Sequence, residues 1–203
     1  MKKLIFIVAV IGLLIGCAPY RDETRPAAFI PRFSEEYIPK GYEFEGNTVS
    51  CKVLNSLAKI KYMEPSDTDL FFLRHNLSNP FLASPILRDN LTVFLVTFVN
   101  NEETTIRFDP RRASIYIDGH YYRGSLDFTE VLVAFEKFSP GSDSDQFKKA
   151  MYDLEVDIGP GKSVEGLLFF PFLPKGSKDI VVMVSGILVR DQTFDVPFEF
   201  EEK

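Results

Sequence analysis

The chain has 203 residues, of which 23 are basic and 29 acidic, so its formal net charge at pH 7 is −6. A chain of this length forms one domain with a sizeable hydrophobic core, or at most two small domains. Because the chain is acidic and carries no basic patch interleaved with aromatic residues, its composition argues against nucleic-acid binding.

The first seventeen residues have the pattern of a secretory signal. Lys2 and Lys3 precede an apolar run over residues 4–15, and the segment closes on Leu14-Ile15-Gly16-Cys17. At about 1.5 Å per residue, the twelve apolar residues of this run span about 18 Å, which is short of a hydrocarbon core of about 30 Å. The pattern therefore predicts a cleaved signal peptide and not a membrane-spanning anchor.

The end of this segment, Leu14-Ile15-Gly16-Cys17, resembles the lipobox of bacterial lipoproteins. In that family the signal is cut before the cysteine, so the resemblance implies a signal peptide over residues 1–16 and acyl chains on Cys17. Two or more acyl chains hold a protein firmly, which implies a membrane partner and a location in the cell envelope. Aspartate after the cysteine often signals inner-membrane retention in such proteins, whereas Ala18 favours the outer membrane in a cell that has one.

Cleavage after residue 16 leaves 187 residues with 21 basic and 29 acidic side chains, a formal charge of −8. Cys51 then has no cysteine partner within the chain. Its alternation with Val49 and Val53 predicts a strand in which the thiol is buried and unreactive. If Cys17 is not acylated, a disulfide between Cys17 and Cys51 remains open.

Residues 17–46 are predicted to form a tether between the membrane and the domain. This segment carries four prolines among charged residues and shows no sustained period of 2 or 3.6. Proline removes a backbone donor and restricts its neighbour, which favours an extended chain. An alternative stays open, in which four apolar or aromatic residues form the first edge strand of the domain: Phe29, Ile30, Phe33 and Tyr37.

Residues 47–203 are predicted to form a domain made mainly of strands. Runs rich in β-branched and aromatic residues predict strands over 92–99, 104–108, 113–117, 164–170, 180–189 and 193–200. Asp118-Gly119 lies between two strand-forming segments and predicts a two-residue hairpin turn. The last three strands are bounded by the turn candidates Gly159-Pro160-Gly161, Pro174-Lys175-Gly176 and Arg190-Asp191-Gln192, and their spacing favours successive antiparallel pairing.

Two segments with helical periodicity interrupt the strands. Asp127 and Glu130 predict a capping box, and apolar residues at helical spacing follow as far as Phe138. A second helix is predicted over residues 145–154. Together they predict one helical insertion over about 127–154, which protects an edge of the sheet rather than binding a partner.

The predicted fold class is mainly β, with two packed antiparallel sheets and a short helical insertion. The run Phe94–Asn101, the Asp118-Gly119 hairpin and the turn Gly159-Pro160-Gly161-Lys162 resemble the strand pattern of immunoglobulin-like domains in bacterial envelope lipoproteins. The resemblance covers about residues 48–200 and implies an immunoglobulin-like β-sandwich. Since the antibody-type cysteine pair and tryptophan are missing, the twenty phenylalanines are expected to fill the interior. A closed barrel is the alternative.

The sequence offers no catalytic, metal-binding or cofactor-binding constellation, so the protein is not expected to be an enzyme. His75 and His120 are expected to be solvated or satisfied within the fold. The pairs Asp67/Asp69 and Asp143/Asp145 lack the glycine and the late glutamate of a calcium loop. The pair Glu102-Glu103 is expected to be solvated at a strand end.

Two apolar segments bear on partner binding. Phe81 in Asn79-Pro80-Phe81 is expected to turn inward, and the run Phe169-Phe170-Pro171-Phe172-Leu173 is expected to be buried, with an exposed binding patch as its alternative. The sequence therefore predicts a lipid-anchored, non-enzymatic protein-interaction or structural module of the cell envelope, with an envelope protein as partner. The alternative is a lipoprotein that binds a small ligand in an apolar cleft.

Overall fold

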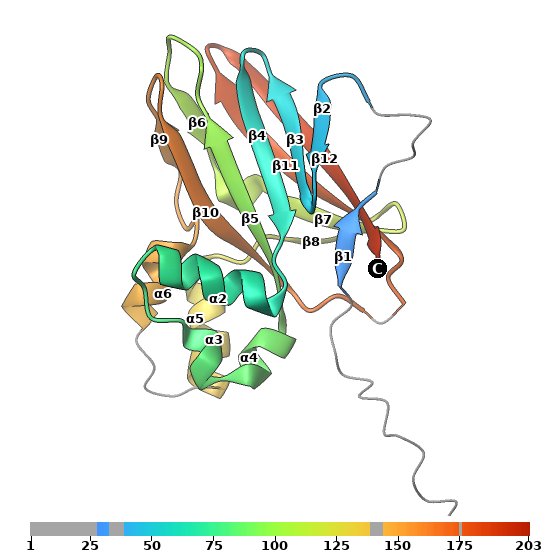
Figure 1. Ribbon diagram of the computed structural model, residues 1–203, viewed down its shortest axis with the longest axis vertical. Coiled ribbons are helices and arrows are strands. Elements are labelled where there is room, and N and C mark those ends of the chain that lie inside the picture. Colours follow the sequence, from blue (N-terminus) through green and yellow to red (C-terminus); the bar gives the residue numbers. More distant parts are fainter. Residues whose placement is uncertain (1–27, 33–38, 139–143, 175) are drawn as a thin grey trace, which may run out of the picture.

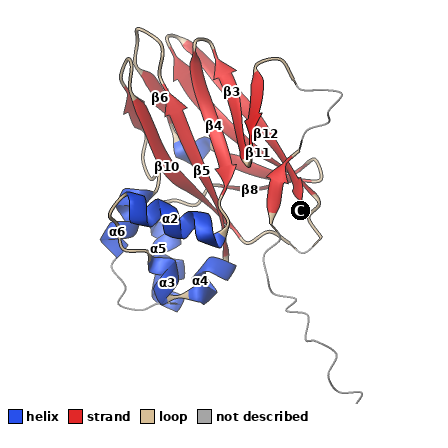
Figure 2. Cartoon of the chain, viewed as in Figure 1, coloured by secondary structure: helices blue, strands red, loops and turns tan. Residues whose placement is uncertain are grey.

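The computed structural model describes residues 28–32, 39–138, 144–174 and 176–203 (Figure 1). Within these residues two antiparallel sheets pack face to face, and the helices gather at one end of the sheets (Figure 2). The prediction of a mainly β protein with two packed antiparallel sheets is confirmed. Cys17 and the predicted signal peptide over 1–16 lie outside the described residues.

One sheet has five strands, and their order begins with the two most apolar ones. In spatial order they are β10 (Ser163–Pro171), β5 (Leu91–Val99), β4 (Ser56–Tyr62), β3 (Thr48–Val53) and β2 (Tyr42–Glu45). The four strands β2 to β5 are neighbours both in the sheet and in the chain. The fifth strand, β10, returns from the second half of the chain to pair with β5.

The other sheet has seven strands. Five follow one another in space: β1 (Phe29–Pro31), β12 (Gln192–Glu202), β11 (Asp179–Val189), β6 (Ile106–Phe108) and β9 (Val156–Ile158). The hairpin of β7 (Ser114–Ile117) and β8 (His120–Gly124) also joins β11, after the single 3-10 turn η1 (Pro110–Arg112).

The predicted strands are all present, but the pairing of one differs from the expectation. β10 pairs with β5 along nine residues instead of pairing with the next strand, β11. Both β10 and β5 carry continuous apolar runs and bury both faces over part of their length, whereas β11 alternates buried and half-exposed residues. Two strands that need cover on both faces lie together where the molecule is three layers thick.

The hairpin predicted at Asp118-Gly119 is confirmed. Ile117 pairs with His120, which leaves two residues in the turn. Asp118 has φ +48° and Gly119 has φ +80°, as the commonest two-residue hairpin turn requires. Aspartate and glycine tolerate this left-handed conformation, so the local sequence specifies the turn.

Part of the segment predicted as a tether belongs to the sandwich. Phe29–Pro31 form β1 at the edge beside β12, and Tyr42–Glu45 form β2 beside β3. The Phe29 side chain is buried against Tyr62. Its burial stabilises this edge strand. The alternative prediction of an edge strand therefore holds for Phe29 and Ile30. Phe33 and Tyr37 lie outside the described residues.

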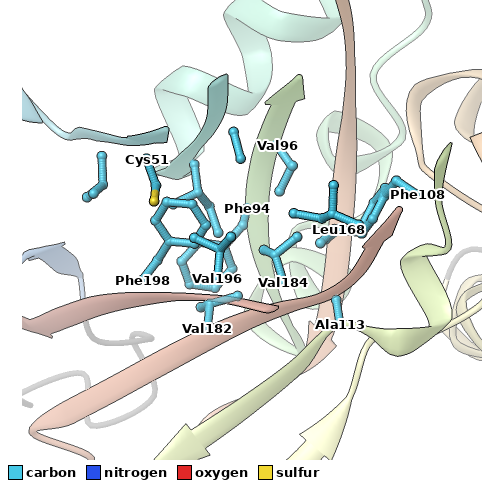
Figure 3. Close-up of a cluster of buried hydrophobic side chains, with 14 of the residues drawn as sticks. Cys51, Phe94, Val96, Phe108, Ala113, Leu168, Val182, Val184, Val196 and Phe198 are labelled. Carbon is cyan, nitrogen blue, oxygen red and sulfur yellow. The ribbon is translucent and has the colours of Figure 1, made fainter. Parts of the chain in front are cut away.

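The core between the two sheets is filled mainly by phenylalanine and valine (Figure 3). In the described part of the chain, the twelve largest fully buried side chains are all phenylalanines. Cys51 lies in this core beside Val49 and Val53, on the inward face of β3. The predicted burial of Cys51 and the predicted role of phenylalanine are therefore confirmed.

The helices come from two insertions, of which the sequence predicted only the second. The missed insertion joins β4 to β5 and contains α2 (Pro65–Arg74), α3 (Pro80–Ala83) and α4 (Pro85–Asp89). The second insertion joins β8 to β9 and contains α5 (Phe128–Phe138) and α6 (Ser144–Ala150). We call α2 to α6 the helical layer. Each helix of the first insertion begins at a proline, a residue favoured in the first helical position.

The helical layer covers the outer face of β5 and β10 and forms a second core there. Its buried members include Phe71, Phe72, Phe81, Phe135, Phe147 and Phe169. Because successive residues of a strand face opposite sides, Phe169 points into this second core and Phe170 into the core between the sheets. The predicted burial of Phe169, Phe170 and Phe81 is thus confirmed.

The second insertion follows the prediction at its start and departs from it at its end. Asp127 and Glu130 form the predicted capping box, because each accepts a hydrogen bond from the other's backbone N–H. The predicted helix over 145–154 stops earlier, since α6 ends at Ala150. Met151 and Tyr152 instead pair with Leu167 on the free edge of β10, and the side chain of Leu154 is exposed.

Candidate functional site

The described chain begins beside the helical layer. The Ala28 carbonyl accepts a hydrogen bond from the backbone N–H of Lys203 at 2.9 Å. The Lys203 ammonium in turn lies 3.5 Å from a carboxylate oxygen of Glu64, the residue that caps the N-terminus of α2. The segment that leads back to Cys17 therefore joins the domain at the end where the helices lie.

Exposed apolar side chains concentrate on the helical layer. Among the described residues, eight large hydrophobic side chains are exposed: Leu54, Leu70, Leu73, Leu82, Ile86, Tyr121, Val133 and Leu154. Five of these belong to the helical layer, and Leu154 lies four residues after α6. The most exposed are Leu73 on α2, at 74%, and Leu82 on α3, at 68%. Single exposed leucines need no explanation, but a group on one layer is typical of an interaction surface.

Asp69 on α2 holds α3 and α4 against it. The Asn79 side-chain amide and the Arg88 guanidinium both donate to the same Asp69 carboxylate oxygen, each at 2.6 Å. Leu73 lies one helical turn after Asp69 and so on the same flank of α2. This arrangement places Leu73 on the side of α2 that adjoins the helices carrying Leu82 and Ile86.

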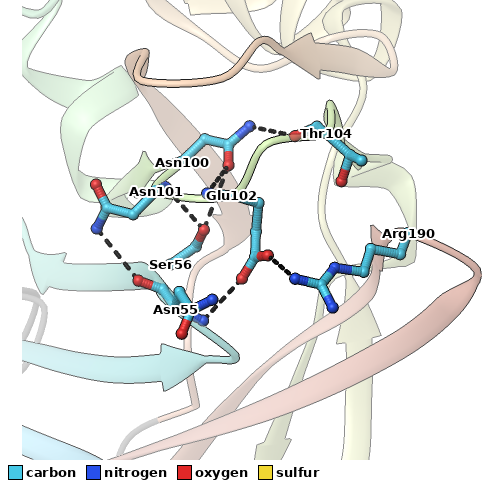
Figure 4. A network of polar contacts seen from close by, with 7 residues as sticks. All are labelled: Asn55, Ser56, Asn100, Asn101, Glu102, Thr104 and Arg190. Atoms are coloured by element: carbon cyan, nitrogen blue, oxygen red, sulfur yellow. Dashed lines mark hydrogen bonds and ion pairs between the residues drawn. The ribbon is translucent and has the colours of Figure 1, made fainter.

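A network of polar contacts lies at the loop after β5 (Figure 4). Asn100 is fully buried, and its side-chain amide makes four hydrogen bonds, the full number available to an amide. Its oxygen accepts from the Ser56 hydroxyl at 3.4 Å and from the Glu102 N–H at 2.8 Å. Its nitrogen donates to the carbonyls of Thr104 at 2.9 Å and Ile158 at 2.7 Å.

Glu102 is part of this network, and its predicted solvation is wrong. The residue is only 3% exposed, while Glu103 is exposed as expected. The Glu102 carboxylate accepts from the Asn55 N–H at 2.8 Å and from the Arg190 guanidinium at 2.7 Å. These bonds, the Asn55 N–H first, hold the pKa of Glu102 below its usual value.

The network around Asn100 and Glu102 binds three turns that are distant in the sequence. Sequence reasoning missed it because no local pattern marks the partners. Since its donors and acceptors are bonded to one another, we assign it a structural role: it fixes the end of the sandwich opposite the helical layer.

His75 is satisfied within the fold, as expected. Its Nδ1 lies 2.9 Å from the Phe71 carbonyl oxygen and its Nε2 lies 3.1 Å from a Glu165 carboxylate oxygen. Its ring packs on that of Phe71 with centroids 4.2 Å apart. His120 is exposed beside the hairpin turn. Within residues 28–32, 39–138, 144–174 and 176–203, no three His, Cys, Asp or Glu side chains are grouped to hold a metal ion.

The carboxylates of Asp67 and Asp69 are held by cations of the fold. The Asp67 carboxylate forms an ion pair with the Lys61 ammonium, with 2.7 Å between nitrogen and oxygen. It also accepts a hydrogen bond from the Glu64 backbone N–H, which completes the capping box of α2. The Asp69 carboxylate forms an ion pair with the Arg88 guanidinium. Both side chains therefore position α2. The other predicted pair includes Asp143, which lies outside the described residues.

Cys51 shares its edge of the core with Tyr42. Burial raises the pKa of the Cys51 thiol, which keeps it protonated and weakly nucleophilic near neutral pH. Burial also raises the pKa of Tyr42, with a further contribution from Cys51, and the Tyr42 hydroxyl donates to the Pro197 carbonyl at 2.7 Å. This contact ties β2 to the opposite sheet.

Comparisons with known proteins add no family to these observations. No protein-family model matches the chain, and searches of curated proteins and of solved structures find no significant match. In the part of the chain that the structure describes, none of the helices has the length and apolar character needed to cross a bilayer.

Proposed function

We propose that the protein is a lipoprotein of the cell envelope, held by acyl chains on Cys17, whose β-sandwich domain is a non-enzymatic protein-interaction or structural module. The observation that carries the proposal is the order of Lys2-Lys3, a short apolar run and Leu14-Ile15-Gly16-Cys17. Acyl chains provide the anchorage that an apolar run of this length does not. Ala18 favours the outer membrane in a cell that has one.

The arrangement of the domain supports a scaffold rather than a catalyst. Three of the side chains that the sequence offers for chemistry are engaged inside the fold: His75 with Glu165, Asp67 with Lys61, and Cys51 within the core. The exposed feature that stands out is apolar and lies on the helical layer. Apolar surface is suited to binding and has no acid, base or nucleophile to offer a substrate.

The proposal includes an immunoglobulin-like class for the sandwich. Two packed antiparallel sheets, short hairpin turns and a core of alternating inward residues support this class. An experimental structure of the mature protein tests it by the strand order in each sheet. If that order differs from immunoglobulin-like domains in both sheets, the domain belongs to another class of sandwich.

The anchoring is tested with Cys17→Ser. We expect the parent protein in the membrane fraction, with an N-terminal peptide whose mass includes acyl chains on Cys17. The Cys17→Ser variant is expected to lose that mass and to leave the membrane fraction after extraction with high salt. Cys51→Ala is the matched control and is expected to behave as the parent. Retention of Cys17→Ser together with an unmodified thiol in the parent contradicts the proposal.

The role as an interaction module is tested by cross-linking in intact cells followed by purification of the acylated protein. We expect one envelope protein to be recovered repeatedly and in constant proportion. Recovery of no protein partner across several cross-linkers and growth conditions counts against an interaction role and leaves a structural one.

A further inference from the structure

The exposed apolar surface of the helical layer lies at the end of the domain where the chain from Cys17 enters. We propose that this surface docks onto the same lipid bilayer that holds the acyl chains, with Leu70, Leu73, Leu82 and Ile86 entering the boundary between headgroups and acyl chains. This inference rests on the proposed anchoring, which it extends by giving the domain one orientation on the membrane.

The chain between the anchor at Cys17 and the domain is short. Ten residues lie between Cys17 and Ala28, which makes eleven steps along the chain, and a fully extended chain spans at most about 3.6 Å per step, or about 40 Å in all. Ala28 is bonded to Lys203, which contacts the cap of α2 at Glu64. The bilayer is therefore always within about 40 Å of the end that carries the helical layer.

The exposed apolar side chains gather on one group of helices. Four leucine and isoleucine side chains project from three short helices that Asp69 holds together: Leu70, Leu73, Leu82 and Ile86. Their exposed fractions lie between 56% and 74%. The opposite end of the described sandwich exposes one comparable side chain, Leu54 at 43%, in the turn between β3 and β4. The apolar surface thus lies at the end of the domain where Ala28, the first described residue, is bonded to Lys203.

The short tether and the apolar character of the surface favour lipid as its occupant over another partner. A short tether keeps the bilayer at a high local concentration around the domain, so weak apolar contacts are sufficient for docking. The mature chain has a formal charge of −8, which opposes electrostatic adsorption to anionic lipids. Docking therefore depends on apolar side chains, which in interfacial proteins enter about 5–10 Å into the headgroup boundary.

The experiment places a fluorescent reporter on the surface. Leu82→Cys is labelled with an environment-sensitive dye in the full, acylated protein, which is then reconstituted into vesicles of phosphatidylethanolamine and phosphatidylglycerol. Cys51 is buried and Cys17 is acylated, so the dye is confined to the new cysteine. Leu54→Cys is the matched control. Leu54 is also an exposed leucine, but it lies before the start of β4, whereas the helical layer follows the end of that strand.

We expect the dye at position 82 to shift its emission to the blue on reconstitution and to be quenched by spin-labelled lipids. The dye at position 54 is expected to emit as in water and to escape quenching. The mass of the N-terminal peptide and flotation with the vesicles are measured on the same samples, which tests the anchoring separately.

The outcomes separate the two proposals. Acylated protein that floats with vesicles while the dye at position 82 emits as in water overturns the docking and leaves the anchoring intact. Absence of acyl chains overturns both. A blue shift that grows with protein concentration in the absence of vesicles assigns the surface to a second copy of the chain. Shielding seen in cell membranes but not in protein-free vesicles assigns it to a protein partner, and both results contradict lipid docking.

Discussion

The carboxylate of Glu102 and the guanidinium of Arg190 lie 2.7 Å apart, although 88 positions separate them in the chain. Glu102 belongs to the loop after β5 and Arg190 to the turn between β11 and β12. The contact therefore links the two sheets at the end of the sandwich opposite the helical layer. Asn55 adds a third segment through its backbone N–H.

Glu102→Gln tests the electrostatic part of this contact. The folded protein holds the pKa of Glu102 below its usual value, mainly through the Asn55 N–H and then through Arg190. A carboxylate with a depressed folded pKa stabilises the protein at pH values above its unfolded pKa of about 4.3, and this stabilisation is lost as the pH falls through the folded pKa. We expect Glu102→Gln to lower Tm near neutral pH, with a deficit that shrinks as the medium is acidified.

The measurement is Tm from circular dichroism over a pH series from neutral to acid. Glu103→Gln is the matched control, because Glu103 is exposed, and it is expected to follow the parent throughout. A Tm deficit of Glu102→Gln that stays constant over the whole series contradicts the role of the charge.

Asn100→Ala tests the buried amide. The substitution leaves the carbonyls of Thr104 and Ile158 and the N–H of Glu102 without their partner. Each buried group left unpaired costs about 1–3 kcal/mol, so we expect a loss of about 3 kcal/mol in the free energy of unfolding measured in urea. Asn101→Ala, at the exposed neighbouring position, is expected to cost less than about 1 kcal/mol. Equal losses for the two variants would refute the role assigned to Asn100.

The sequence predicted those elements whose determinants are local. The run over 92–99 specifies β5 by its β-branched and aromatic residues, Asp118-Gly119 specifies a turn by its tolerance of positive φ, and Asp127 with Glu130 specifies a helix start. In each case the residues that decide the structure are within a few positions of one another. The pairing of β10 with β5 was not predictable in this way, since it depends on which strand needs cover on both faces.

The helices α2 to α4 were missed because they are short and their apolar residues are few. Phe71 and Phe72 are adjacent, which is typical of a strand. In the fold both are buried on α2 in the second core, where Phe72 packs against Phe81 and Phe147. The prolines at 65, 80 and 85 were the available signal, since each occupies the first helical position. Glu102 was predicted as solvated because Arg190, which it meets in the fold, is distant in the sequence.

Gly166→Ala tests the close contact between β10 and the segment after α6. A β-carbon at position 166 would lie 2.9 Å from ring carbons of Tyr152, whose ring is buried and whose hydroxyl donates to the Val164 carbonyl. Such overpacking typically costs about 1–3 kcal/mol, so we expect a loss of this size in the free energy of unfolding. Gly159→Ala meets only an ordinary contact at 3.8 Å with Lys162 and is expected to be neutral or slightly stabilising. An unchanged stability for Gly166→Ala contradicts the packing described for Tyr152.

Alkylation of Cys51 by iodoacetamide tests the burial of the thiol. Burial raises the pKa of Cys51, and the species that reacts is the thiolate. The folded protein is therefore expected to react only when the sheet edge formed by β2 and β3 opens. We expect alkylation on the order of a hundredfold slower in buffer than in denaturing urea, measured by mass spectrometry of the Cys51 peptide. A cysteine introduced by Leu54→Cys, at the exposed position directly after β3, provides the internal standard because it should react quickly in both conditions. If Cys51 and the introduced cysteine react at the same rate in the folded protein, the edge formed by β2 and β3 is open in solution, and the contact of Tyr42 with Pro197 does not hold it closed.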